Sequence, residues 1–397
     1  MKAVLWISLC ISSVVNAQRF VNIHQKAKMV DTHNDLLTAV IEKNLLMDAD
    51  LRGKTHSDLN RFKEAGVDCQ LFSVWCDGEK QHPYAWANRE IDTLYAVAAR
   101  NPDKITIVAN SKQAFKTIKA GKIAAMFGVE GGHMIENDIN KLDSLYARGV
   151  RYMTLTWNNS TNWASSAMTE NMPALKGTPN QSLDGKRGLT DFGTQVVQRM
   201  NQLGMLVDLS HVGEQTFWDA IKTTTKPVLV SHSNAYALCP VFRNLKDAQI
   251  KAVAQNGGVI HLNFYSGFVD SGFKKREIAF MASHAKEIDS LKQTGMQQEY
   301  AMSIITSKYQ EESNALRPPL SALLDHLDYI VKIAGVDHVG MGSDFDGITS
   351  SPQQLDDVTN YPLITKALLE RGYSKKDIYK IMGGNFWRVL AANEKNK

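Results

Sequence analysis

Histidine and carboxylate residues recur in this sequence at the ends of short apolar runs. The five motifs are Val30-Asp31-Thr32-His33-Asn34-Asp35, Gly128-Val129-Glu130-Gly131-Gly132-His133, Asp208-Leu209-Ser210-His211, Val230-Ser231-His232 and Met341-Gly342-Ser343-Asp344. One histidine at a strand end is more often a hydrogen-bonded core residue than a ligand. Five such ends together are hard to reach by chance, and imidazole with carboxylate is the ligand set of zinc and related ions. The sequence therefore predicts a metal site.

The number of candidate ligands favours two metal ions over one, because a single catalytic zinc needs only three protein ligands. His33 and Asp35 are two residues apart, so on an extended strand their side chains point the same way. We expect both on one Zn²⁺, with Glu130 and a water or hydroxide as bridges. The second Zn²⁺ would take His211 and His232. Such a pair brings the pKa of bound water toward about 7 and polarises a carbonyl, which indicates metal-assisted hydrolysis.

Asp344 is the remaining carboxylate among these motifs. Two Zn²⁺ ions carry more positive charge than Asp35, Glu130 and a hydroxide can balance, so another carboxylate nearby is tolerated. Because Asp344 is not needed as a ligand, we expect it to be free to act as a base.

The elements that would position these residues alternate along the chain. Helical patterns separate the apolar runs; Thr190 to Leu203 stops at Gly204, and Glu214 to Thr223 stops before Pro227. Eight apolar strands alternating with helices predict a (β/α)₈ TIM-type barrel, whose chemistry lies at the carboxyl ends of the strands. An open doubly wound sheet is the second interpretation. The predicted strands are 28–33, 67–75, 122–129, 150–156, 205–210, 227–232, 258–264 and 337–343.

Two segments are additional to the strands and helices of a simple (β/α)₈ barrel. Residues 158–188 are rich in Gly, Pro and Asn, which is typical of a long loop above a strand end. Residues 268–318 are charged and helix-prone, and they predict a helical insertion. We expect 18–397 to form a single domain that contains both segments.

The N-terminus predicts export. Lys2 precedes a short apolar run, and Val15-Asn16-Ala17 ends it with a small residue, so 1–17 is expected to be a signal peptide of a periplasmic or secreted protein. A buried N-terminal helix is the alternative. The run is too short to span a bilayer comfortably, and the polar C-terminus offers no membrane anchor.

Composition adds further limits. The 397 residues include 45 Lys plus Arg and 41 Asp plus Glu, a net charge of +4, with 44% hydrophobic and 22% charged residues. These values are typical of a folded soluble protein, and the small surplus does not favour nucleic acid as a partner. Cys69 and Cys76 flank one predicted strand and are too far apart to pair. A pair with Cys239 stays open beside free buried thiols.

Taken in order, the motifs quoted above resemble the membrane (renal) dipeptidase family. The segments Gly342-Ser343-Asp344-Phe345-Asp346-Gly347 and Gly383-Gly384-Asn385-Phe386-Trp387-Arg388 also carry the resemblance, which covers roughly 28–392. It implies a dizinc peptidase on an amidohydrolase-like barrel that cleaves dipeptides, often with a D-residue at the C-terminal position. It also implies the ligand set given above. In the same way it implies Asp344 as the general acid and base, which orients the bridging water and passes its proton to the leaving amine. Arg243 lies where the family holds the substrate's terminal carboxylate.

Trp157 is the main departure from the family pattern. Animal members carry a histidine there that is thought to bind the carbonyl oxygen, whereas indole offers one donor and cannot become a cation. We expect Trp157 to contact the substrate. Either Asn158, Asn159 or a zinc stabilises the oxygen, or the pocket suits other substrates. The 268–318 insertion is longer than expected for the family, and the polar C-terminus differs from lipid-anchored members.

Two rival functions remain. One is another amidohydrolase-type activity, such as β-lactam or lactone hydrolysis or deamination. The other is a non-catalytic metal-binding homologue, which Trp157 favours and Asp344 opposes. The sequence leaves a homodimer open.

Overall fold

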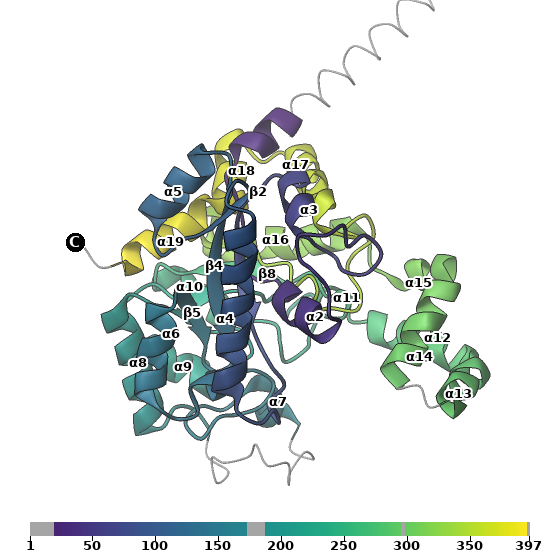
Figure 1. Cartoon of the computed structure of the whole chain (residues 1–397), viewed down its shortest axis with the longest axis horizontal. Helices are drawn as coiled ribbons and strands as arrows, with labels where there is room; N and C mark the ends of the chain where they lie inside the picture. Colours follow the sequence, from purple (N-terminus) through teal and green to yellow (C-terminus); the bar gives the residue numbers. More distant parts are fainter. Residues whose placement is uncertain (1–19, 173–186, 295–297, 395–397) are drawn as a thin grey trace, which may run out of the picture.

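The computed structural model describes residues 20–172, 187–294 and 298–394, and its core is a closed barrel of eight parallel strands surrounded by helices (Figure 1). Neighbouring strands pair in chain order, β2 pairs directly with β4, and β1 pairs with β9 to close the ring. The predicted (β/α)₈ barrel is confirmed, and the doubly wound sheet is excluded. The barrel strands are β1 (Met29–Asp31), β2 (Val67–Val74), β4 (Ile123–Glu130), β5 (Val150–Thr154), β6 (Leu206–Asp208), β7 (Leu229–Val230), β8 (Val259–Leu262) and β9 (Val339–Met341).

A ninth strand, β3 (Ile105–Ile107), was not predicted. It pairs with the first half of β4, where Ile105 lies opposite Ile123, and β5 pairs with β4 only from Phe127 onward. The strand therefore lies beside the ring and does not interrupt it. Its three residues are too few to produce an apolar run that the sequence would reveal.

Most barrel strands are shorter than the apolar runs that predict them, because buried carboxylates replace the last ladder hydrogen bonds. The run 337–343 leaves the sheet after β9, and the backbone N–H of Ser343 donates to Asp31 Oδ1 at 2.9 Å. The backbone N–H of Ser231 likewise donates to Asp208 Oδ1 at 2.8 Å. These side chains satisfy buried donors and allow the chain to turn at the mouth of the barrel.

The helices begin and end near the predicted signals. In α8 the side chain of Thr190 accepts from the backbone N–H of Gly193, and Gly204 ends the helix at a φ of 81°. The predicted helix Glu214–Thr223 is α9. The main helices around the barrel are α2 (Leu36–Glu42), α3 (Leu59–Glu64), α4 (Pro83–Arg100), α5 (Ser111–Lys119), α6 (Ile139–Ala147), α8 (Asp191–Leu203), α9 (Glu214–Thr223), α10 (Asp247–Gln255), α16 (Leu320–Ala334), α17 (Tyr361–Glu370), α18 (Lys375–Tyr379) and α19 (Asn385–Asn393), with the short α7 (Ala167–Asn171) and α11 (Ser266–Val269) in loops.

The barrel interior is a packed core. Side chains such as Leu71, Met126 and Leu206 form one buried cluster with Phe386 and Leu390 of α19. Cys69, Cys76 and Cys239 are free, buried thiols, so the alternative without a disulfide is confirmed.

In the described part of the predicted insertion the chain forms four helices, and these project from one side of the body (Figure 1). They are α12 (Phe273–Ser283), α13 (Ala285–Gln293), α14 (Gln298–Lys308) and α15 (Gln310–Leu316). Phe280, Ile288, Ala301 and Ile305 form a small core of their own within it. A cavity of about 730 Å³ separates the insertion from the loops after β8 and β9.

Within the described ranges, none of the helices combines the length and apolar character needed to cross a bilayer. The predicted signal peptide lies outside the described residues, as does part of the predicted 158–188 loop.

Candidate metal centre and active site

His33 and Asp35 follow β1, where the chain runs beside the segment after β9. Asn34 forms a β-bridge with Phe345, and the backbone N–H of Asp35 donates to the Phe345 carbonyl at 2.9 Å. His33 and Asp35 are buried, and Nε2 of His33 lies 3.5 Å from Oδ2 of Asp35. The spacing of two residues therefore brings an imidazole and a carboxylate together, as predicted.

Glu130 ends β4 and lies between histidines from three other strands. Its Oε2 is 3.2 Å from Nε2 of His33. Its Oε1 is 2.9 Å from Nε2 of His211 and 3.5 Å from Nε2 of His232. Because the two oxygens face different histidines, this carboxylate has the geometry to bridge two cations. Ligand atoms within 4.8 Å of one another form three groups: His33, Asp35 and Glu130; Glu130, His211 and His232; and His33, His232 and Asp344.

The rings of His33 and His232 are oriented through their second nitrogens. Nδ1 of His33 is 2.8 Å from the Tyr152 hydroxyl. Nδ1 of His232 is 2.8 Å from Oγ of Ser231, which donates to Asp208 at 2.6 Å. With Nδ1 occupied, each ring turns Nε2 toward Glu130. Such partners fix the tautomer of metal-binding histidines and hold the ring in place.

Several buried polar atoms at the centre lack a favourable hydrogen-bond partner. Among the described residues, Nε2 of His33 and Oδ1 of Asp35 are buried without a hydrogen bond. Nε2 of His211 and Nε2 of His232 are only 2.9 Å apart. Buried polar atoms without a partner destabilise the folded protein. A cation placed between these nitrogen and oxygen atoms would bind their lone pairs. The residues present therefore fit a metal.

Burial and neighbouring charges shift the pKa values of the titratable groups at the centre. Burial lowers the pKa of His33, but the carboxylates of Glu130 and Asp35 outweigh it and raise this pKa to about 10. Burial lowers the pKa of His211 to about 4, assisted by the positive charge of Arg243. Burial also raises the pKa of Asp344 to about 6, and the Glu130 carboxylate adds to this effect. The raised pKa values of His33 and Asp344 reflect carboxylates gathered in a buried site, where a bound metal cation would supply balancing positive charge.

Asp344 follows β9 and has a left-handed backbone with a φ of 63°, which is also the φ of His211. Oδ2 of Asp344 accepts from Nδ2 of Asn263 at 2.7 Å, while Oδ1 lies 3.9 Å from Nε2 of His33. A Cβ at Gly347 would collide with Oδ2 of Asp35, so only glycine fits beside these carboxylates. The left-handed backbone at Asp344 and His211 is strained, and such strain is common at functional sites.

Arg243 lies in the segment between β7 and α10 and is 5% exposed. Nη1 donates to Oγ of Ser233 and Nη2 to the His232 carbonyl, both at 3.2 Å. Nε has no hydrogen-bond partner among the described residues. A cavity of about 80 Å³ is lined by Arg243, Ser233 and His211. A guanidinium with an unused donor therefore lies next to the cluster of candidate metal ligands.

Trp157 follows β5 and is partly exposed. Its ring packs edge-to-face on Trp75 with centroids 5.0 Å apart, and it lies 6.5 Å from the His211 ring. A Cβ at Gly131 would come within 2.5 Å of the His133 ring and 3.2 Å of the Trp157 Cβ, so the glycine after Glu130 leaves space chiefly for His133. The two indoles form an aromatic wall at the mouth of the barrel.

Residues 17–397 match the family described as Membrane dipeptidase (Peptidase family M19). The chain belongs to this family. It is therefore a metallo-dipeptidase, and the resemblance noted in the sequence is confirmed. The probable dipeptidase PvdM from Pseudomonas aeruginosa is similar in structure, with 23% identity, coverage of 95% of this chain and 98% of that chain, and a TM-score of 0.76. A metallo peptidase from Rhodobacter sphaeroides, liganded with a phosphinate mimic of the dipeptide L-Ala-D-Ala, has 22% identity, covers 92% and 99%, and has a TM-score of 0.73.

Sequence reasoning missed the residues that orient the dipeptidase centre. Tyr152 lies inside the barrel on β5, and Asn263 follows β8. Alternation along 150–154 places Tyr152 on the inward face, and this pattern was a usable signal. Gly128 faces the Tyr152 ring, and any Cβ there would overlap the ring. The need for glycine at this point depends on a contact between two strands and has no local signature.

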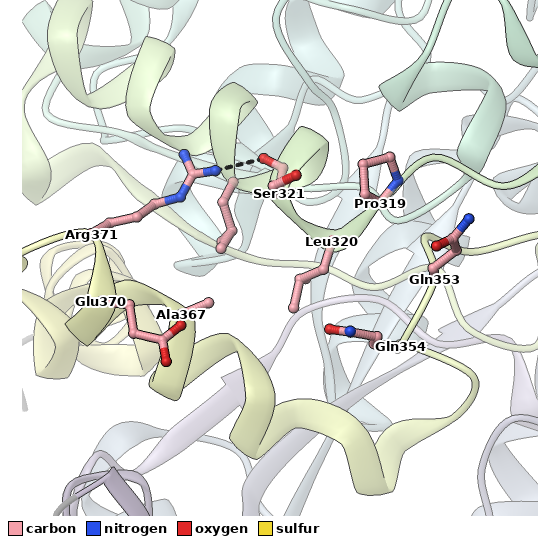
Figure 2. Close-up of a pocket in the computed structure, with 9 residues that line it drawn as sticks. Pro319, Leu320, Ser321, Gln353, Gln354, Ala367, Glu370 and Arg371 are labelled. Atoms are coloured by element: carbon pink, nitrogen blue, oxygen red, sulfur yellow. Dashed lines mark hydrogen bonds between the residues drawn. The ribbon is translucent and has the colours of Figure 1, made fainter. Parts of the chain in front are cut away.

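A groove lies on the dipeptidase barrel away from the candidate metal ligands, where the start of α16 faces the end of α17 (Figure 2). Its volume is about 370 Å³, and it is lined by none of the predicted site residues. Arg371 donates to the Ser321 carbonyl at 2.8 Å and pairs with Asp325 and Asp328. The guanidinium of Arg371 is therefore occupied by these partners.

Proposed function

We propose that this enzyme is an exported dizinc dipeptidase that hydrolyses the peptide bond of dipeptides and tolerates a D-residue at the C-terminal position. The observation that carries the proposal is the placement of Glu130, whose two oxygens face separate histidine groups. His33 and Asp35 would hold one Zn²⁺, and His211 and His232 the other. When bound, the ions would activate a water molecule and polarise the scissile carbonyl.

Asp344 is the proposed general acid and base. Asn263 binds its Oδ2 and thereby fixes the carboxylate, which leaves Oδ1 directed toward the cluster. From this position Oδ1 can accept the proton of the attacking water and deliver it to the leaving amine. A raised pKa favours both transfers, because the group must gain and lose a proton near neutral pH.

Arg243 is the proposed anchor for the substrate's terminal carboxylate. Its buried guanidinium has an unused Nε donor beside the cavity next to His211. A planar guanidinium binds a carboxylate through two parallel hydrogen bonds. The L-Ala-D-Ala mimic bound to the Rhodobacter sphaeroides protein supports tolerance of a D-residue at this end.

The proposal is tested by turnover and metal content of the purified protein. We expect about two zinc per chain by elemental analysis and hydrolysis of L-Ala-L-Ala and L-Ala-D-Ala. Tripeptides and C-terminally amidated dipeptides should react poorly. Turnover of lactones or β-lactams in place of dipeptides would favour another hydrolase activity, and metal binding without any turnover would indicate a binding homologue.

Arg243→Lys is expected to raise KM for dipeptides about 10- to 100-fold with a smaller effect on kcat. Lysine keeps the charge but loses the planar pair of donors, and a tenfold change corresponds to about 1.4 kcal/mol. Steady-state kinetics measure the effect. Arg199→Lys, on the outer surface in an ion pair with Asp143, is the matched control and should keep KM unchanged. Equal cleavage of free and amidated dipeptides by the unmodified enzyme would contradict this role.

Trp157→Ala is expected to lower kcat/KM about tenfold for dipeptides with a bulky apolar residue and to change L-Ala-L-Ala little. Loss of the indole removes apolar area that such a side chain would cover, and full burial of a large side chain is worth about 1.5–3 kcal/mol. Trp157→Phe keeps an aromatic ring and should retain most of this preference. A uniform loss on all substrates would show that Trp157 acts on the reaction itself.

Export by residues 1–17 and assembly as a homodimer stay predictions. N-terminal sequencing of the protein recovered from the periplasm or the medium tests the first, and light scattering tests the second.

A further inference from the structure

His211 is oriented by a different kind of partner from the other two histidines. Hydroxyl groups lie against Nδ1 of His33 and of His232, whereas Nδ1 of His211 lies 3.1 Å from the side-chain amide oxygen Oδ1 of Asn158. An amide oxygen only accepts hydrogen bonds, so this contact requires a proton on Nδ1. Nε2 is then unprotonated and faces Oε1 of Glu130.

The segment around Asn158 also holds the backbone of His211. The carbonyl of His211 accepts from the backbone N–H of Ala167 at 2.8 Å and from the Thr156 hydroxyl at 3.3 Å. Ser166 donates to the carbonyl of Asn158 at 2.6 Å and so connects the two ends of this segment. A histidine with a φ of 63° costs energy, and surrounding contacts must maintain it. The loop after β5 therefore contacts both the ring and the backbone of His211.

We propose that Asn158 is a positioning residue for the metal centre, since its Oδ1 keeps the proton of His211 on Nδ1 and presents Nε2 as the ligand atom. The inference rests on the proposed role of His211 as a ligand. It also gives Asn158 a different role from the one considered from the sequence, where Asn158 was one of three alternatives for stabilising the substrate carbonyl oxygen. With Oδ1 on the imidazole, Asn158 acts through His211.

The adjacent Asn159 provides a matched control. Its Nδ2 approaches the Ser160 carbonyl at 3.5 Å, and its side chain packs against Gly78 on the loop after β2. The two asparagines share residue type, loop and partial exposure. Within the part of the chain that the structure describes, Asn158 contacts His211 and Asn159 does not.

The test compares zinc affinity of Asn158→Ala, Asn158→Asp and Asn159→Ala, measured by competition with a chromophoric chelator. Loss of such a partner typically weakens metal affinity about 10- to 100-fold. We expect this loss for one of two zinc equivalents in Asn158→Ala, together with a lower kcat and little change in KM. Asn158→Asp restores the acceptor and should recover the affinity. Asn159→Ala should bind both zinc equivalents as tightly as the unmodified protein.

The outcomes separate this inference from the proposed function. If the unmodified protein binds no zinc, the proposed function fails. If the unmodified protein binds two equivalents and Asn158→Ala binds them equally well, the positioning role is overturned. A raised KM with unchanged zinc affinity would also overturn it and place Asn158 on the substrate. Thermal unfolding of the metal-free variants should be equal for Asn158→Ala and Asn159→Ala, and a lower Tm for Asn158→Ala alone would indicate a merely structural role.

Discussion

Asp344→Asn is expected to retain about two zinc per chain and to lose kcat by a factor of about 10² to 10⁴, the usual contribution of a general acid or base. The amide keeps the size of the carboxylate, but it cannot accept the proton of the attacking water. Elemental analysis and steady-state kinetics on one preparation measure both quantities. Loss of a zinc equivalent would instead make Asp344 a ligand.

The pH dependence gives a second readout of the same residue. Activity requires the ionised carboxylate, so it should fall as the pH drops through the pKa of Asp344. That pKa is about 6 without metal, and bound cations would lower it, so the acid limb is expected at or below about pH 6. The limb should disappear from the residual activity of Asp344→Asn.

Asp346→Asn is the matched control for this substitution. Asp346 lies two residues further along the same loop, where its carboxylate accepts from the backbone N–H of His56 and from the Ser57 hydroxyl. Its amide variant should keep both zinc equivalents and most of kcat. An equal loss of kcat in both variants would indicate that the loop, and not the proton transfer, is disturbed.

Glu130→Gln is expected to weaken both zinc equivalents and to abolish turnover. The carboxylate faces His33 with one oxygen and two other histidines with the second, so no other predicted ligand contacts both groups as closely. Removal of one partner from a buried charge pair costs about 3–5 kcal/mol. This corresponds to a factor of about 10² to 10⁴ in affinity. Titration of the metal-free variant with zinc measures the change.

Two further variants sharpen this test. Asp35→Asn should weaken one equivalent only, because Asp35 contacts the His33 side of the centre. Glu136→Gln, in the loop after Glu130, removes a charge that pairs with Lys141 away from the centre, and it should change neither equivalent. A Glu130→Gln variant that binds two zinc as tightly as the unmodified enzyme would rule out the bridge.

The barrel could be predicted because its strands are buried on both faces. Parallel strands covered by helices need apolar runs, and all eight runs overlap a barrel strand. Helix ends such as Thr190 and Gly204 were predictable for the same local reason, since a cap depends on residues next to it. The three-residue β3 is too short to carry such a signal.

What the sequence by itself determined was the residue types at the strand ends, and with them the family and the class of chemistry. The side chains of His33 and Asp35 point to the same side because the residues are two apart. This alternation is a local property of an extended chain. What only the tertiary structure decided was which atoms meet. Tyr152 orients His33, Asn158 orients His211, and Glu130 turns its two oxygens to different histidines. These contacts join residues far apart in the chain, and they exist only when the closed barrel brings its strand ends to one mouth.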